Sequence, residues 1–149
     1  STKLETIKSK GIQIRHSGSL AKLSPSTKKT ILRAIEETKN NRKAVLNFCV
    51  NYGGRQEIIK AVNDWMESAR PGEKISDKKL EKYLYTAGLP EPDLLIRTSG
   101  EYRISNFLLW QLAYTELYFT DVLWPDFGPD DLRKAVVEYQ KRERRYGGL

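Results

Sequence analysis

The sequence predicts an α/β fold with an open, mainly parallel sheet flanked by helices. Two apolar runs, AVLNFCVN at 44–51 and DLLIR at 93–97, are typical of parallel strands that are buried on both faces. Segments with helical spacing alternate with these runs, as right-handed crossover connections require. With 149 residues the chain has the size of one domain, and we expect a single domain over residues 1–149.

The amino-terminal third is predicted to form a helix, a short strand and a second helix. Residues 2–9 have the spacing of the last turns of an amphipathic helix, which Gly11 is placed to end. Residues 12–15 alternate as a short strand does. Ser24 precedes a proline, which makes it the expected N-cap of a helix that runs to about Thr38.

Two further helices are expected between the apolar runs. Gly53 and Gly54 turn the chain into a helix whose inward positions are Ile58, Val62, Trp65 and Ala69. Pro71 breaks that helix, and a further helix over residues 76–85 is expected to be capped by Ser76.

The carboxyl-terminal third is expected to begin with the 93–97 strand, which delivers Arg97 to its carboxyl end. A short apolar helix over 106–114, a strand over 116–119 and a final helix from Pro129 should follow.

The composition is basic. Lys and Arg outnumber Asp and Glu by 26 to 19, so the net charge is +7 and the pI is near 9.5. This balance favours phosphate-bearing partners, namely nucleic acid, anionic membrane or diphosphates, although a solvated surface is an equally good explanation. No apolar run reaches the roughly 18 residues of a spanning helix, so we expect a soluble protein. Cys49 is the only cysteine, which excludes a disulfide framework and favours a buried structural thiol.

The segment after the second predicted strand carries the clearest candidate site. Ligands of open parallel sheets bind at the carboxyl ends of the strands, where Arg97 lies. Arg103 and Ser105 stand two positions apart and can point the same way if the segment is extended. Together with the amino end of the predicted 106–114 helix, these groups suit a diphosphate. The alternative is that the arginines pair with Glu101 and Asp93 and only hold the loop in place.

Two other ionisable residues stand out. Glu116 lies within an apolar stretch, where a carboxylate needs a cation, either an arginine or Mg²⁺. His16 is the only histidine, and nothing near it in the sequence makes it a base or a ligand, so we expect an ordinary surface residue.

Four segments in order resemble the cis-prenyltransferases, the undecaprenyl diphosphate synthase or isoprenyl transferase family. They are NYGGR at 51–55, DLLIRTSGEYRISNFLLWQ from Asp93, AYTELYFTDVLWPDF from Ala113 and RERRYGG at 142–148. The resemblance implies an enzyme that condenses isopentenyl diphosphate onto an allylic diphosphate to make a cis-polyprenyl diphosphate, a lipid carrier precursor.

The resemblance also implies roles for single residues. Arg97, Arg103 and Ser105 match the positions that hold the diphosphate of isopentenyl diphosphate, and Glu116 matches a carboxylate associated with Mg²⁺. Arg145 and Gly147 match a carboxyl-terminal R-x-G element that reaches toward a diphosphate site in a homodimer. The product would be membrane-associated, and the expected location is the cytoplasm, with a peripheral position at the inner face of the membrane left open.

The sequence departs from the family pattern in two places. It has no D-G-N-G-R-W-A loop, whose aspartate is catalytic in the family, so no catalytic residue is assigned. With the uncapped helix at 2–9, this predicts the carboxyl-terminal part of a longer enzyme, without the first strands of the family fold and without activity when isolated. Tyr102 replaces a histidine that lies near the metal in some members.

Two other classes of function stay open at this point. A non-catalytic partner subunit of a cis-prenyltransferase would also lack the aspartate, but it would have less use for Arg97, Arg103 and Ser105 together. A basic nucleic-acid-binding domain would place aromatic residues on an exposed basic surface, whereas the aromatics here lie in apolar runs, so no nucleic-acid partner is expected.

Overall fold

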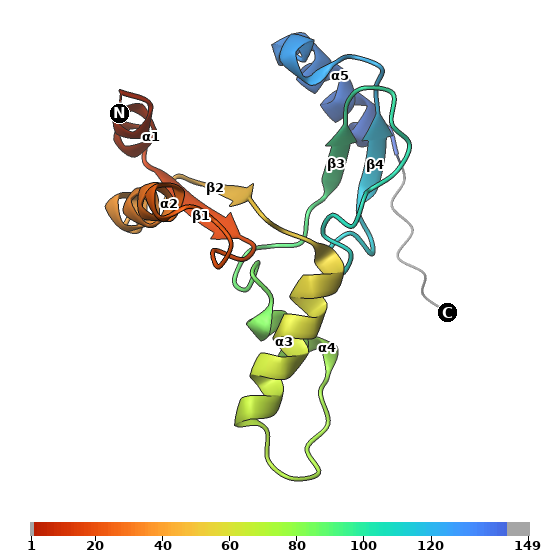
Figure 1. Cartoon of the computed structure of the whole chain (residues 1–149). Helices are drawn as coiled ribbons and strands as arrows, with labels where there is room; N and C mark the ends of the chain where they lie inside the picture. The colour runs from red at the N-terminus through yellow and green to blue at the C-terminus, as the bar shows by residue number, and fades with distance from the viewer. Residues whose placement is uncertain (1, 143–149) are drawn as a thin grey trace. The chain divides into compact units, whose positions relative to one another are not determined.

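The computed structural model of the chain describes residues 2–142, and the chain divides into two compact units, Ser1–Gly88 and Leu89–Leu149, which are described separately (Figure 1). The first unit contains α1 (Thr2–Ser9), β1 (Ile12–Ser17), α2 (Pro25–Thr38), β2 (Ala44–Cys49), α3 (Gly54–Ser68), α4 (Asp77–Leu80) and the 3₁₀ turn η1 (Glu81–Tyr83). The second contains β3 (Leu94–Arg97), β4 (Glu116–Phe119), η2 (Trp124–Asp126) and α5 (Pro129–Gln140).

Each unit is built on one pair of parallel strands. β1 pairs with β2 from Ile12↔Ala44 to Ser17↔Cys49, and β3 pairs with β4 from Leu94↔Glu116 to Arg97↔Phe119. The predicted α/β class with parallel strands and flanking helices is therefore confirmed. The strands lie in two pairs within the described residues, and the single domain over 1–149 stays a prediction.

α2 is the crossover between β1 and β2, and its two ends explain its length. The Ser24 hydroxyl accepts a hydrogen bond from the Thr27 N–H at 3.2 Å, so the predicted N-cap is confirmed. At the other end the fully buried Thr38 hydroxyl accepts the N–H of Ile14 at 2.9 Å and donates to the Ala34 carbonyl at 2.8 Å. One threonine thus satisfies a backbone donor of β1 and holds the end of α2 against the strand.

Replacing Ser24 by alanine removes the acceptor for the Thr27 N–H and should lower the free energy of unfolding by about 1 kcal/mol. Urea unfolding followed by circular dichroism would measure it. Ser26→Ala, two residues later in the first turn of α2, keeps the Ser24 acceptor and is the control, and an equal loss from both variants would contradict the capping role.

The β2 strand forms where predicted, although it ends at Cys49, and its burial differs from the expectation. Val45, Leu46 and Phe48 are 45%, 38% and 45% exposed. The reason is that a strand with one partner in a two-stranded pair lacks the second neighbour that a wider sheet supplies. Cys49 is half-buried, and burial, with a further contribution from the Glu57 carboxylate, raises the pKa of its thiol, as expected for an unreactive cysteine.

Two predicted helices need correction. The expected helix over 76–85 is one α-helical turn followed by η1, and the side chain of Ser76 makes no capping bond. The expected helix over 106–114 is absent, and the segment is a series of turns. Ser105, Asn106 and Leu108 have φ of 46°, 63° and 43°, a left-handed conformation that a right-handed helix cannot include.

His16 is partly exposed, and the expectation that it is an ordinary surface residue stays a prediction. It lies in β1, half-buried, and its Nε2 is 3.0 Å from the Val50 carbonyl oxygen, close to the carboxyl ends of both strands of the pair. Within residues 2–142, none of the helices has the length and apolar character needed to cross a bilayer.

Candidate functional site

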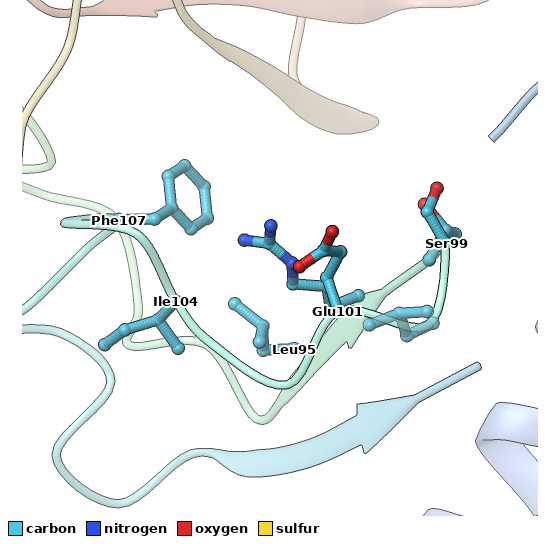
Figure 2. A pocket seen from close by; sticks show the side chains of 8 residues that line it. Leu95, Ser99, Glu101, Ile104 and Phe107 are labelled. Carbon is cyan, nitrogen blue, oxygen red and sulfur yellow. The ribbon is translucent and has the colours of Figure 1, made fainter. Parts of the chain in front are cut away.

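A cavity of about 320 Å³ lies where β3 ends. Its described lining residues are Leu95, Ile96, Arg97, Thr98, Ser99, Glu101, Ile104 and Phe107 (Figure 2). Figure 2 shows Leu95, Ile104 and Phe107 gathered at one side, Ser99 at the other, and the Glu101 carboxylate between them. The cavity therefore combines an apolar wall with charged and hydroxyl groups.

The loop that follows Arg97 is held in place by backbone hydrogen bonds. The N–H of Ser99 donates to the Val122 carbonyl and that of Gly100 to the Thr120 carbonyl, each at 2.9 Å. The N–H of Thr120 in turn donates to the Arg97 carbonyl at 3.0 Å. These bonds fix the backbone at the carboxyl end of β3, so the Arg97 side chain starts from a defined position.

Arg97 and Ser105 are brought together as predicted. Arg97 is half-buried and lines the cavity, and its Nη1 donates to the Ser105 hydroxyl at 3.4 Å. The helix whose amino end was expected to support this site does not exist, so the site has no helix dipole. Arg97, Thr98, Ser99 and Glu101 form the polar lining of the cavity instead, and the Ser105 hydroxyl is bonded to the Arg97 guanidinium.

Arg103 pairs with a carboxylate of its own loop, which was the alternative to a diphosphate-binding role. Its Nη1 forms an ion pair with Glu101, whose carboxylate lines the cavity, and 63% of the Arg103 side chain is exposed. Arg103 is therefore linked to the cavity indirectly, by its ion pair with Glu101, which lines it. An incoming anion would have to compete with that carboxylate for the guanidinium.

Glu116 has an arginine partner. It is the first residue of β4, and the Nη1 of Arg142, just beyond the end of α5, donates to Glu116 Oε2 at 2.8 Å and to the Leu117 carbonyl at 2.9 Å. Arg142 begins the RERRYGG segment, but the sequence analysis assigned it no role. No local signal links positions 26 residues apart, so only the fold could reveal this pair.

A magnesium ion fits this carboxylate only as one ligand among several. Among residues 2–142 no group of three or more His, Cys, Asp or Glu side chains is arranged to hold a metal. Mg²⁺ commonly takes one or two protein carboxylates and completes its shell with water and substrate phosphates. Glu116 therefore offers a single carboxylate, which is already paired with Arg142 at the end of the strand pair remote from Arg97.

Two of the predicted site residues, Arg145 and Gly147, lie outside the described residues. Tyr102 is 75% exposed, and its ring lies tilted against Phe119 with ring centroids 5.2 Å apart. The roles assigned to Arg97, Arg103, Ser105 and Glu116 stay predictions.

Fold and site together define an α/β protein with parallel strands and a guanidinium beside an apolar wall where a strand ends. The chain belongs to the undecaprenyl diphosphate synthase family, because the family profile described as "Putative undecaprenyl diphosphate synthase" matches residues 1–147. The resemblance drawn from the four sequence segments is therefore confirmed.

Relatives with known names are similar over nearly the whole chain. An isoprenyl transferase of Heliobacterium mobile is 49% identical over 150 residues, 98% of this chain and 58% of that protein. One from Clostridium perfringens is 43% identical over 98% of this chain and 59% of that protein. The chain thus spans somewhat under three-fifths of the length of these relatives.

Solved structures agree with the fold. The crystal structure of a probable undecaprenyl diphosphate synthase from Campylobacter jejuni superposes with a TM-score of 0.86 at 31% identity, covering 97% of this chain and 67% of that one. Lavandulyl diphosphate synthase from Lavandula x intermedia, in complex with dimethylallyl diphosphate, superposes with a TM-score of 0.91 at 36% identity, covering 97% and 64%.

Proposed function

We propose that this chain supplies the isopentenyl diphosphate side of an isoprenyl transferase that builds a cis-polyprenyl diphosphate from isopentenyl diphosphate and an allylic diphosphate. The observation that carries the proposal is the cavity at the end of β3, which the Arg97 guanidinium, bonded to Ser105, lines together with apolar side chains. Family membership supports the reaction class. The complex of the lavender enzyme with an allylic diphosphate supports the second substrate.

The two sides of the cavity suit the two parts of such a substrate. A guanidinium offers a planar set of N–H donors that matches phosphate oxygens, and the Ser105 hydroxyl can add a further donor. Leu95, Ile104 and Phe107 offer apolar surface to a short branched hydrocarbon. Binding holds the substrate with its diphosphate at Arg97 and its carbon skeleton against that wall.

Magnesium, homodimer formation, a cytoplasmic location and the membrane-associated product belong to the same proposal. When bound, Mg²⁺ would neutralise diphosphate charge, and Glu116 is the carboxylate that the family resemblance assigns to it. A non-catalytic partner subunit of a cis-prenyltransferase is the second hypothesis. The combination of Arg97, Arg103 and Ser105 favours a substrate-binding role over it.

Binding of isopentenyl diphosphate tests the proposal directly. Isothermal titration of the chain should show binding, and Arg103→Ala should weaken it by about 1.5 to 3 kcal/mol, because charge-assisted hydrogen bonds to phosphate are lost. Arg133→Ala is the matched control, since Arg133 is also exposed and also ion-paired, with Asp130.

The outcomes separate the parts of the proposal. No binding by the unmodified chain would contradict the proposed function. Binding that is equally strong in Arg103→Ala and Arg133→Ala would remove Arg103 from the site and leave Arg97 and Ser105 as its polar groups.

A further inference from the structure

We propose that the amino-terminal end of the β1–β2 strand pair is a docking surface for an anionic lipid bilayer. This surface, which we call the basic end, is formed by five exposed cations, Lys8, Lys10, Lys39, Arg42 and Lys43. The proposed function uses none of these residues. The choice of a lipid as the partner rests on that function, because its product is membrane-associated.

The excess positive charge of the chain is concentrated before β2. Residues 1–43 contain eleven Lys and Arg against three Asp and Glu, whereas residues 44–149 contain fifteen against sixteen. The net charge of +7 therefore comes entirely from the segment that precedes β2. Such an asymmetry along a chain is typical of a protein that binds a polyanion or a charged membrane.

The fold gathers the cations where α1 and α2 end and where β1 and β2 begin (Figure 1). The N–H of Lys43 donates to the Gly11 carbonyl at 3.0 Å, and the Asn41 side-chain amide donates to the Lys8 carbonyl at 3.3 Å. The Lys43 Cβ lies 3.3 Å from the position that a Cβ on Gly11 would occupy. These contacts hold residues 8–11 and 41–43 side by side, so their charges form one surface.

The local structure accounts for only part of this charge. Arg42 Nη1 donates to the Lys39 and Asn41 carbonyls at 2.7 and 3.0 Å, at the carboxyl end of α2, where the helix dipole favours a cation. The side chains of Lys10 and Lys43, in contrast, have no hydrogen-bond or ion-pair partner among the described residues. Their ammonium groups are therefore available to an external anion.

Two carboxylates lie near the basic end, and both are already shared. The ion pairs there join Lys39 with Glu36 at 2.5 Å and Lys8 with Glu37 at 3.8 Å. Glu37 also pairs with Arg33, which adds a further cation. Positive charge is thus in excess, and these exposed pairs are weak enough for an anionic surface to compete with them.

The composition favours a bilayer over nucleic acid. Residues 1–43 contain no Phe, Trp or Tyr, so the segments that form the basic end supply no ring on which a base could stack. Eight of their eleven cations are lysines, which act as point charges and suit the diffuse negative charge of anionic headgroups.

The position of the basic end is also compatible with ligand binding elsewhere. It lies at the amino ends of β1 and β2, whereas open parallel sheets bind their ligands at the carboxyl ends of the strands. A bilayer at the basic end would therefore leave the carboxyl ends of this strand pair accessible to soluble substrates.

Co-sedimentation of the whole chain with lipid vesicles tests the proposal. The chain should bind vesicles of phosphatidylcholine with about one third phosphatidylglycerol, should release them as salt is raised, and should not bind phosphatidylcholine alone. Replacing Lys10 and Lys43 together by glutamine should weaken binding on the order of thirtyfold. The matched control is Lys78→Gln with Lys82→Gln, which removes the same charge from two exposed lysines in α4 and η1 of the same unit.

Each remaining outcome counts against the basic end. Absence of binding to the anionic vesicles, or equal binding to phosphatidylcholine alone, overturns the proposal. An equal loss from the two double variants shows that overall charge, and not this surface, binds the bilayer. Tighter binding to a duplex oligonucleotide than to the anionic vesicles makes the surface one for nucleic acid and also overturns the proposal.

The proposed function is tested separately. Titration with isopentenyl diphosphate should give the same affinity in the unmodified chain and in the Lys10 and Lys43 double variant. Failure of isopentenyl diphosphate to bind the unmodified chain contradicts the proposed function, whereas loss of vesicle binding with that affinity intact contradicts the docking surface alone.

Discussion

Glu57→Ala is expected to lower the free energy of unfolding by about 3 kcal/mol, because it removes the buried carboxylate that two half-buried hydrogen-bond donors share. Glu57 is 1% exposed and lies in the first turns of α3. Its Oε2 accepts the Tyr52 hydroxyl at 2.5 Å and its Oε1 accepts the N–H of Tyr85 at 2.8 Å. The carboxylate thus joins the NYGGR loop, α3 and the turn after η1.

Aromatic contacts add to the two hydrogen bonds that the Glu57 carboxylate accepts. Tyr52 and Tyr85 meet edge to face with centroids 6.4 Å apart, and Lys60 Nζ lies 5.2 Å from the Tyr85 centroid. Loss of the carboxylate therefore frees both aromatic residues from a common anchor, and the cost should exceed that of a single bond.

Urea unfolding of Glu57→Ala against Glu67→Ala checks this expectation. Glu67 is an exposed glutamate on the same helix, so it controls for the change in charge and helix propensity. Glu57→Gln should fall between them, since an amide keeps one acceptor. Equal stability of the Glu57→Ala and Glu67→Ala variants would show that the buried carboxylate does not hold this part of the first unit together.

Gly18→Ala should also cost about 3 kcal/mol or more, since it combines an unfavourable backbone conformation with a clash. Gly18 has φ of 125°, and a Cβ there would lie 2.3 Å from the Val50 carbonyl oxygen and 2.9 Å from that of Asn51. Both are backbone atoms, which cannot move aside as a flexible side chain does. The alanine would force apart the segments that follow β1 and β2.

Those segments are bonded to each other directly. The N–H of Ser19 donates to the Asn51 carbonyl at 3.1 Å, and the Asn51 side-chain amide donates to the Ser19 carbonyl at 2.7 Å. Separation of the two backbones would break both bonds. The segments that follow β1 and β2 would then no longer pair where the NYGGR loop begins.

Gly72→Ala supplies the control for conformation alone. Gly72 has φ of 79°, and a Cβ there would meet no atom within 4 Å, so only the left-handed backbone is penalised, at about 1 to 2 kcal/mol. Thermal or urea unfolding of both variants separates the two effects. A loss in Gly18→Ala no larger than in Gly72→Ala would mean that the strand ends can part without cost.

Local rules predicted the elements whose boundaries depend on neighbouring residues. Ser24 and Pro25 set the start of α2, and the apolar pattern placed β4 at Glu116–Phe119 and α5 from Pro129. The same rules failed for 106–114, because the spacing of apolar residues does not determine the sign of the backbone φ angle. Residues 105, 106 and 108 have positive φ, which a right-handed helix cannot include.

For the site, the sequence alone determined the family, since the quoted motifs carry it, and it predicted that Arg97 and Ser105 lie near each other. Only the tertiary structure decided that Arg103 is held by Glu101, that Arg142 reaches Glu116 and that Glu57 is buried between two tyrosines. The physical reason is that a charged side chain takes the nearest counter-charge or donor in space, and only the fold decides whether that partner is a close neighbour in the sequence, as Glu101 is for Arg103, or lies 26 residues away, as Glu116 does from Arg142.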